Sequence, residues 1–154
     1  GLLLHGVLGV KLWFENRSSR PERYQKTIES KASFSSKFMV HTGIIILVFL
    51  IIHFINFYFV KLGLVSPPEG ISNHDFYNMS ILLFSNKIYS IIYLVCFLFL
   101  GFHLNHSIQS GFQSLGWYHD KYTPLVKLIS TIYSILIAVG FAIIPVYFLF
   151  FFNA

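Results

Sequence analysis

The sequence predicts an all-α transmembrane protein, an antiparallel helix bundle with one partial span and three complete spans. Hydrophobic residues make up 55% of the 154 positions and charged residues only 11%, whereas about a quarter of a soluble chain is charged. The mean hydropathy is +0.67. Residues 38–60 contain no Asp, Glu, Lys or Arg across 23 positions, and uncharged runs also follow Lys87 and Lys127. Each run can cross a hydrocarbon core of about 30 Å as a helix.

Each segment of the chain can be assigned in order within one membrane domain, residues 1–154. Residues 1–14 are apolar, but they carry no initiator Met and no basic leader, so we expect the end of a helix and a chain that is a fragment. The predicted spans are 1–14 (partial), 38–60, 88–110 and 128–152, and the predicted loops are 15–37, 61–87 and 111–127. Within the second loop, DFYNMSILLFSN predicts a short interfacial helix.

The distribution of basic residues predicts the orientation. Nine Lys/Arg residues lie in or beside loops 15–37 and 111–127, whereas Lys61 and Lys87 are the only two around loop 61–87. Because positive loops stay in the cytoplasm, we expect 61–87 and the C-terminus to lie outside. The net charge of +5 is no sign of nucleic-acid binding, because these basic residues lie in loops between spans. The single Cys96 cannot form an internal disulfide.

Five of the seven histidines lie within the predicted spans or at their ends: His5, His41, His53, His103 and His106. We expect His74 and His119, in loops, to be solvated. An ionisable residue inside a membrane is a functional candidate by default, and the alternative is a neutral histidine hydrogen-bonded to a neighbouring helix. At a rise of about 1.5 Å per residue, His5 and His103 reach one level in the inner half, while His53 stands alone in the outer half.

Two neutral imidazoles at one level between helices fit a bis-histidine haem. Zinc prefers three or four clustered ligands, and a proton relay usually includes Asp or Glu, which no complete predicted span contains. Small residues flank the pair, Gly6 and Gly9 beside His5 and Gly101 beside His103, and they offer room for a flat porphyrin. Haem binding is therefore the first interpretation. Structural histidines, another metal and a proton path remain open.

Three segments of the chain resemble one protein family. FHLNHSIQSGFQSLGW, GIIILVFLIIHFINFYF and NRSSRPERYQ are similar to the di-haem cytochrome b membrane-anchor subunit of bacterial succinate dehydrogenase/fumarate reductase, of the five-helix, single-subunit type. In that family, four histidines on four successive helices bind two b haems. Carried over to this sequence, the axial ligands of haem iron are His5, His53 and His103. The fourth ligand would lie upstream of Gly1.

The resemblance also implies how these residues divide between the cofactors. The inner haem b takes His5 and His103, and the outer haem b takes His53 with the upstream histidine. His103 is preferred to His106 because it matches the family motif. Four residues are secondary candidates for contacts with haem propionates or quinone: His106, His41, Arg17 and Arg20.

An anchor of this kind relays electrons between an iron–sulfur subunit and the membrane quinone pool, and has no catalytic residue of its own. The resemblance implies menaquinone as substrate, a flavoprotein (FAD) subunit and an iron–sulfur subunit as partners, and the bacterial inner (cytoplasmic) membrane as location. Two alternatives stay open. One is the di-haem cytochrome b anchor of a formate dehydrogenase or hydrogenase, and the other is a non-haem transporter or structural membrane protein.

Overall fold

The computed structural model describes residues 1–18, 34–117 and 119–152, and all regular secondary structure in these residues is helical. The elements are α1 (Leu2–Ser18), α2 (Phe34–His53), the π-helix η1 (Phe54–Tyr58), α3 (Phe59–Lys61), α4 (Phe76–Ser85), α5 (Lys87–Ser114) and α6 (Thr123–Phe150). The predicted all-α class is therefore confirmed for the described residues. The short helix α4 lies within the segment that predicted one.

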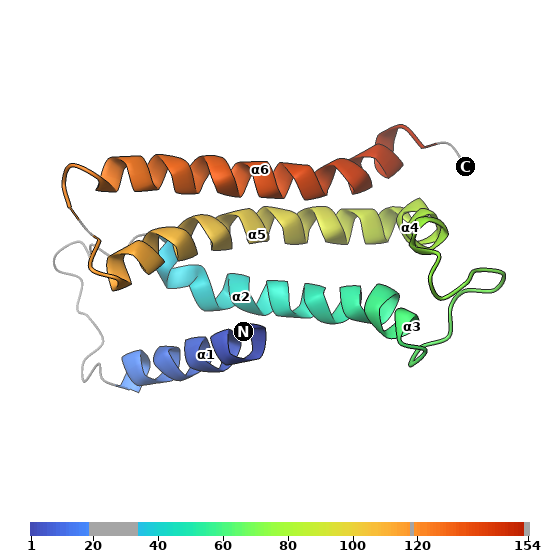
Figure 1. The fold of residues 1–154 in the computed structure, drawn as a ribbon, viewed down its shortest axis with the longest axis horizontal. Helices are drawn as coiled ribbons and strands as arrows, with labels where there is room; N and C mark the ends of the chain where they lie inside the picture. The colour runs from blue at the N-terminus through green and yellow to red at the C-terminus, as the bar shows by residue number, and fades with distance from the viewer. Residues whose placement is uncertain (19–33, 118, 153–154) are drawn as a thin grey trace.

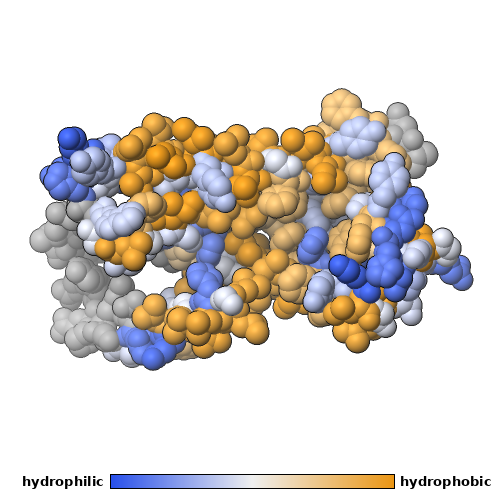
Figure 2. All heavy atoms as spheres, in the orientation of Figure 1, coloured by the Kyte–Doolittle hydropathy of each residue, from blue (hydrophilic) through white to orange (hydrophobic). Residues whose placement is uncertain are grey.

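Three helical stretches are long and apolar enough to cross a membrane: Phe38–Lys61, Lys87–Ser114 and Thr123–Phe150. At most 22% of the most apolar part of each is buried inside the molecule, so most of its side chains are partly or fully exposed. Hydrophobic residues cover most of the middle of the molecule in Figure 2, and hydrophilic residues gather toward its two ends. An exposed apolar surface of this extent marks contact with lipid or protein. The fold is consistent with a multi-pass membrane protein.

The long helices lie side by side, and α2, α5 and α6 run in alternating directions (Figure 1). The connection between α5 and α6 lies at the same end as the start of α2 and the end of α1, while α4 and the end of α6 lie at the other. α1 runs beside the half of α2 nearer the first of these ends. α1 continues to Ser18 and α2 begins at Phe34, so both helices extend into the segment 15–37 that was predicted as a loop.

Local sequence signals define both ends of α5. The Asn86 side chain accepts a hydrogen bond from the Ile88 amide at 3.0 Å and so caps the first turn. At the other end Gly116 adopts a left-handed conformation with φ of 76°. Its amide donates to the Gln113 carbonyl and the Trp117 amide to the Phe112 carbonyl, both at 3.0 Å. These two bonds form a Schellman motif. The Gly-Trp step therefore ends the helix.

Small residues allow close packing of α5 against α6. Ser130 and Ser134 of α6 are buried, and their hydroxyls donate to carbonyls one turn earlier in the same helix, at 2.6 and 2.7 Å. A Cβ on Gly101 would lie 3.1 Å from Cβ of Ala138. Gly101 thus provides room for α6, and the expectation that it makes room for a porphyrin is wrong. Small residues at helix contacts are typical of membrane proteins.

Aromatic side chains pack together at the end of the molecule near α4. Phe84, Tyr93 and Phe97 are buried, and Phe49 of α2 packs partly buried against them. Phe49 meets Tyr93 and Phe97 in edge-to-face contacts, with ring centres 5.0 and 5.4 Å apart, a favourable arrangement for aromatic quadrupoles. This cluster joins α2, α4 and α5 on the side of the molecule that carries His53.

Candidate haem site

His5 of α1 and His103 of α5 lie against each other. Their ring centres are 6.2 Å apart and the ring planes are nearly perpendicular, at 86°. His5 and His103 are separated in the sequence by α2, α4 and the connections between them. In the structure they lie at one level, as predicted from their depths in the spans. His5 is exposed and His103 is half-buried.

A hydrogen bond orients the His103 imidazole. The buried Thr42 hydroxyl donates to the Met39 carbonyl at 2.9 Å and lies 3.0 Å from His103 Nδ1. In the tautomer with its hydrogen on Nδ1, His103 donates to Thr42 Oγ1 while the Thr42 hydroxyl donates to Met39. The lone pair of the neutral ring is then on Nε2. A ligating histidine in a metal site commonly donates its second N–H in this way, which fixes both the tautomer and the ring orientation.

Gly43 lies beside the same imidazole. A Cβ at this position would be 3.6 Å from Cε1 of His103, an ordinary contact distance that leaves no room for a larger side chain. Sequence reasoning missed Thr42 and Gly43. Counting residues from the inner ends of the predicted spans would have found both, because it places them within about one helical turn of the His103 level.

The separation of the two rings is compatible with a metal ion between them. With metal–nitrogen bonds of about 2 Å, an iron between two imidazoles holds the ring centres about 6 Å apart, close to the separation of His5 and His103. Among residues 1–18, 34–117 and 119–152 there is no group of three or more His, Cys, Asp or Glu side chains that could hold a metal ion. A pair of imidazoles is fewer ligands than a zinc site commonly has, and it is the number that a bis-histidine haem takes.

His53 stands apart from this pair, at the last residue of α2. Its ring stacks on Phe49 with centres 5.7 Å apart and lies 5.1 Å from Phe57 and 6.3 Å from Tyr93. Nδ1 is buried, and no residue of the described chain hydrogen-bonds to it. Burial of a polar atom without a partner costs free energy. A group outside the described residues could therefore interact with this imidazole.

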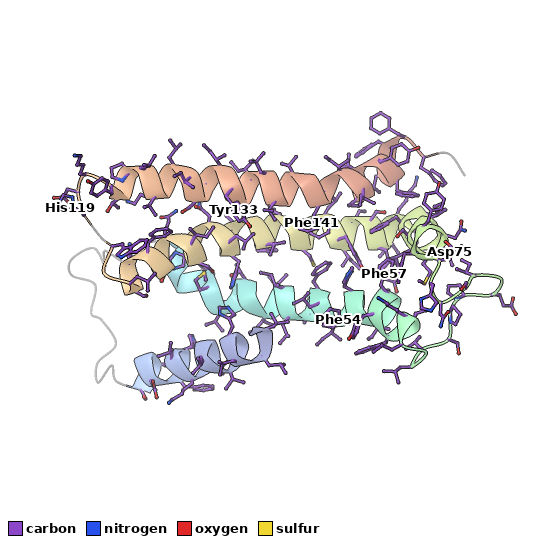
Figure 3. All side chains as sticks on the ribbon, viewed as in Figure 1. Phe54, Phe57, Asp75, His119, Tyr133 and Phe141 are labelled. Carbon is purple, nitrogen blue, oxygen red and sulfur yellow. The ribbon has the colours of Figure 1, made fainter. Side chains whose placement is uncertain are left out.

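The π-helix η1 begins at the residue after His53, and the sequence pattern contains no sign of it. π-Helical turns inside α-helices are often found at functional sites. Figure 3 shows Phe54 and Phe57 of η1 in the same half of the molecule as Asp75, the residue that caps α4. The irregular turn thus lies at the outer level of the bundle, next to the candidate outer ligand.

A cavity of about 260 Å³ opens near η1. Its lining combines apolar and polar side chains: Asn56, Pro68, Met79, Leu82, Leu83, Asn86 and Tyr89. Asn56 Nδ2 is buried, and within the described residues no acceptor lies at hydrogen-bonding distance and angle. Apolar walls with a few polar groups are typical of small-molecule sites. Sequence reasoning did not find this cavity, because its walls come from α4, α5, η1 and the loop before α4.

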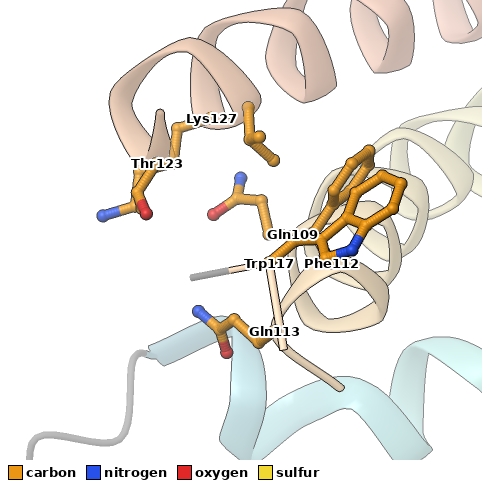
Figure 4. A pocket seen from close by; sticks show the side chains of 7 residues that line it. Gln109, Phe112, Gln113, Trp117, Thr123 and Lys127 are labelled. Carbon is orange, nitrogen blue, oxygen red and sulfur yellow. The ribbon is translucent and has the colours of Figure 1, made fainter. Parts of the chain in front are cut away.

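The inner half of α5 carries a polar face. Gln109 donates to the Asn105 side chain at 2.7 Å, and the Thr131 hydroxyl of α6 lies 3.3 Å from the same Asn105 oxygen. Gln109, Gln113 and Lys127 surround a cavity of about 10 Å³ between α5 and α6, with Phe112 and Trp117 beside it (Figure 4). A space of this size holds about one water molecule. The polar face therefore belongs to a hydrated helix end.

The secondary candidates lie near the pair or outside the described residues. His106 is half-buried, one turn after His103. His41 is exposed, and its ring lies 5.8 Å from that of Phe38. The Arg17 guanidinium lies 5.6 Å above the Trp13 ring, a cation–π contact. Arg20 lies outside the residues that the structure describes.

No family model, curated protein or solved structure matches this chain.

Proposed function

We propose that this chain is a haem b-binding membrane anchor of a succinate dehydrogenase/fumarate reductase, which relays electrons between an iron–sulfur subunit and membrane quinone. The observation that carries the proposal is the pairing of His5 with His103, in which the Nδ1 of His103 is engaged by Thr42. The resemblance of three segments of the chain to that family implies the same two histidines as ligands of the inner haem.

Each residue of the inner site has a defined part in this function. His5 and His103 would hold the haem iron, Thr42 contacts Nδ1 of the His103 ring, and Gly43 lies beside the same ring. The bound haem supplies one-electron redox chemistry at its iron. Axial ligand identity, the hydrogen bond to the ligand and the apolar surroundings are the features by which a protein sets the haem potential.

The outer half of the molecule is proposed to complete the electron path. His53 would bind the second haem with a histidine upstream of Gly1, on the first helix of a five-helix antiparallel bundle. The cavity beside Asn56 supports menaquinone as the substrate, because an amide N–H without a partner can donate to a quinone carbonyl. The loops rich in Lys and Arg would face the cytoplasm and dock the iron–sulfur subunit, which in turn contacts the flavoprotein. On this proposal, the chain lies in a bacterial inner membrane with its C-terminus outside.

Two other functions would use some of the same features. A formate dehydrogenase or hydrogenase anchor would also hold haem between helices, and copurification with a flavoprotein and an iron–sulfur subunit distinguishes the succinate complex from these. A transporter or structural membrane protein would keep its histidines without haem. The contact of His103 Nδ1 with Thr42 favours haem, because in the tautomer with its hydrogen on Nδ1 the lone pair of the ring is on Nε2.

The test is a reduced-minus-oxidised spectrum of the purified protein. We expect a b-type α-band, and its absence would refute haem binding. His103→Ala should abolish the inner haem, whereas the matched variant His106→Ala should retain it. The opposite result would identify His106 as the ligand.

A further inference from the structure

Ser107 follows His103 by one helical turn, on the same face of α5 and nearer the end at which α5 meets the connection to α6. Its hydroxyl is buried and has no hydrogen-bond partner among the described residues. Other serines of α4, α5 and α6 behave differently, because their hydroxyls donate to backbone carbonyls four or six residues earlier: Ser80, Ser85, Ser90, Ser114, Ser130 and Ser134. Ser107 thus differs from these serines, whose hydroxyls each have a hydrogen-bond acceptor.

A buried hydroxyl without a partner costs free energy, more so where lipid replaces water. Ser107 can keep such a position at low cost if a group outside the chain accepts its hydrogen. Four residues of helix separate it from His103, about 6 Å along the axis. That is within reach of the edge of a ring bound at His103, so a ligand of the histidine pair is the nearest source of an acceptor.

We propose that Ser107 donates a hydrogen bond to a propionate of the haem held by His5 and His103. This inference rests on the proposed function. The propionates are the anionic groups of haem, and a charge in an apolar interior needs donors. Ser107 lies toward the polar half of α5, with Asn105 and Gln109, so the propionate edge points to the end where α5 joins α6. Ser107 is a positioning residue that fixes which way round the haem binds.

The rate of haem release tests this hydrogen bond. Haem transfer from the purified haem-loaded protein to excess apomyoglobin is followed for wild type, Ser107→Thr and Ser107→Val, two side chains of equal shape that differ in the hydroxyl. We expect about tenfold faster release from the Val variant, since a hydrogen bond to a charged group is lost, and wild-type release from the Thr variant. Ser114→Ala is the control and should release haem at the wild-type rate, because this hydroxyl already donates to Ser110. Equal release from the Thr and Val variants would overturn the proposal.

A second arm replaces haem b by its dimethyl ester, in which both propionates are methylated. The difference between the Thr and Val variants should then disappear, because the charged acceptor is gone. A difference that persists with the ester would show that Ser107 acts on another group. The absence of a b-type band in the wild-type protein would overturn the proposed function itself. If the protein binds haem but substitution of Ser107 does not change the rate of haem release, only this inference is overturned.

Discussion

Thr42 shows how one side chain can set the chemistry of another. Its oxygen lies 2.9 Å from the Met39 carbonyl and 3.0 Å from His103 Nδ1. A histidine in the span would otherwise be free to rotate about its side-chain bonds, and the contact with Thr42 restricts this rotation. On the proposed function, His103 donates its Nδ1–H to Thr42, and Nε2 is then the nitrogen that would bind iron.

Loss of this hydrogen bond should weaken haem binding. Thr42→Val keeps the shape of the side chain but removes the acceptor, so we expect haem affinity to fall by about 10- to 100-fold. Thr42→Ser keeps the hydroxyl and should bind haem like the wild type. Titration of the haem-free protein with haem, followed by the b-type absorbance, measures the affinity. Equal affinity of the Val and Ser variants would contradict the role assigned to Thr42.

The residue scale is also where sequence reasoning was least complete. The depth of His5 and His103 follows from helix rise and span limits alone, so their meeting could be predicted. Thr42 and Gly43 could not be assigned a role in the same way, because their contacts with His103 depend on how α2 is rotated. Apolar side chains surround α2 on all sides, and such a pattern does not indicate which face meets a neighbour.

At the scale of the element, α5 ends where the backbone turns left-handed at Gly116. Gly116→Ala should destabilise the protein by about 1 kcal/mol, because a side chain disfavours this conformation. Gly111→Ala is the matched control, since Gly111 lies inside α5 with nothing within 4 Å of an added Cβ. It should stabilise by roughly 0.5–1 kcal/mol through higher helix propensity. Thermal unfolding in detergent measures both variants, and a shift of the same sign for the two would disprove the capping role.

The start of α4 depends on the charge of Asp75. Its carboxylate accepts from the Asn78 side chain at 2.6 Å and from the Asn78 amide at 3.1 Å, and these hydrogen bonds lower the pKa of Asp75 from its ordinary value. A lowered pKa in the folded state means that the cap contributes fully above the unfolded pKa, about 4. Its contribution disappears as pH falls through the lower folded pKa.

We therefore expect the first turn of α4 to lose order only in acid, below about pH 4. The Asn78 amide resonance in detergent-solubilised protein, followed against pH, reports this change. Asp75→Asn also caps helices well but does not titrate, so its Asn78 resonance should stay constant over the same range. If the Asn78 resonance of the wild type does not change with pH, the charge of Asp75 does not contribute to the cap.

The π-helix η1 marks the limit of prediction at this scale. Spans, their order and the short helix α4 follow from runs of apolar residues and from cap residues such as Asp75 and Asn86. η1 has the same apolar composition as the α-helix before it, and the change to a wider turn involves only backbone hydrogen bonds. It directly follows His53, whose ring lies 6.3 Å from that of Tyr93.

At the scale of the whole molecule, the two ends differ in charge and can be told apart by experiment. Asp75 and His119 lie at opposite ends (Figure 3). Glu69→Cys and Lys121→Cys, each in a Cys96→Ser background, place one exposed thiol at each end. A membrane-impermeant maleimide added to intact spheroplasts should label only the Glu69→Cys variant, because the loop with Lys121 is predicted to be cytoplasmic. Labelling of the Lys121→Cys variant alone would reverse the orientation.

The helical class and the spans could be predicted because a membrane requires long apolar runs and internally satisfied backbones. The tight contact between α5 and α6 could not. It depends on Gly101 of α5 lying against Ser134 and Ala138 of α6, where Ser130 and Ser134 are buried. The pairing of faces is decided by close packing of small residues, which hydropathy does not measure.

The exposure of α1 bears on how the protein is made. None of the described side chains of α1 is buried, and its contact with α5 runs through His5. Within lipid, apolar side chains gain little by exchanging lipid contacts for helix contacts. In the structure α1 also lies beside α2, so two neighbouring helices hold it in place. On the proposed function, haem bound between His5 and His103 would add a further link from α1 to α5, and an anchor made without haem would hold α1 less firmly.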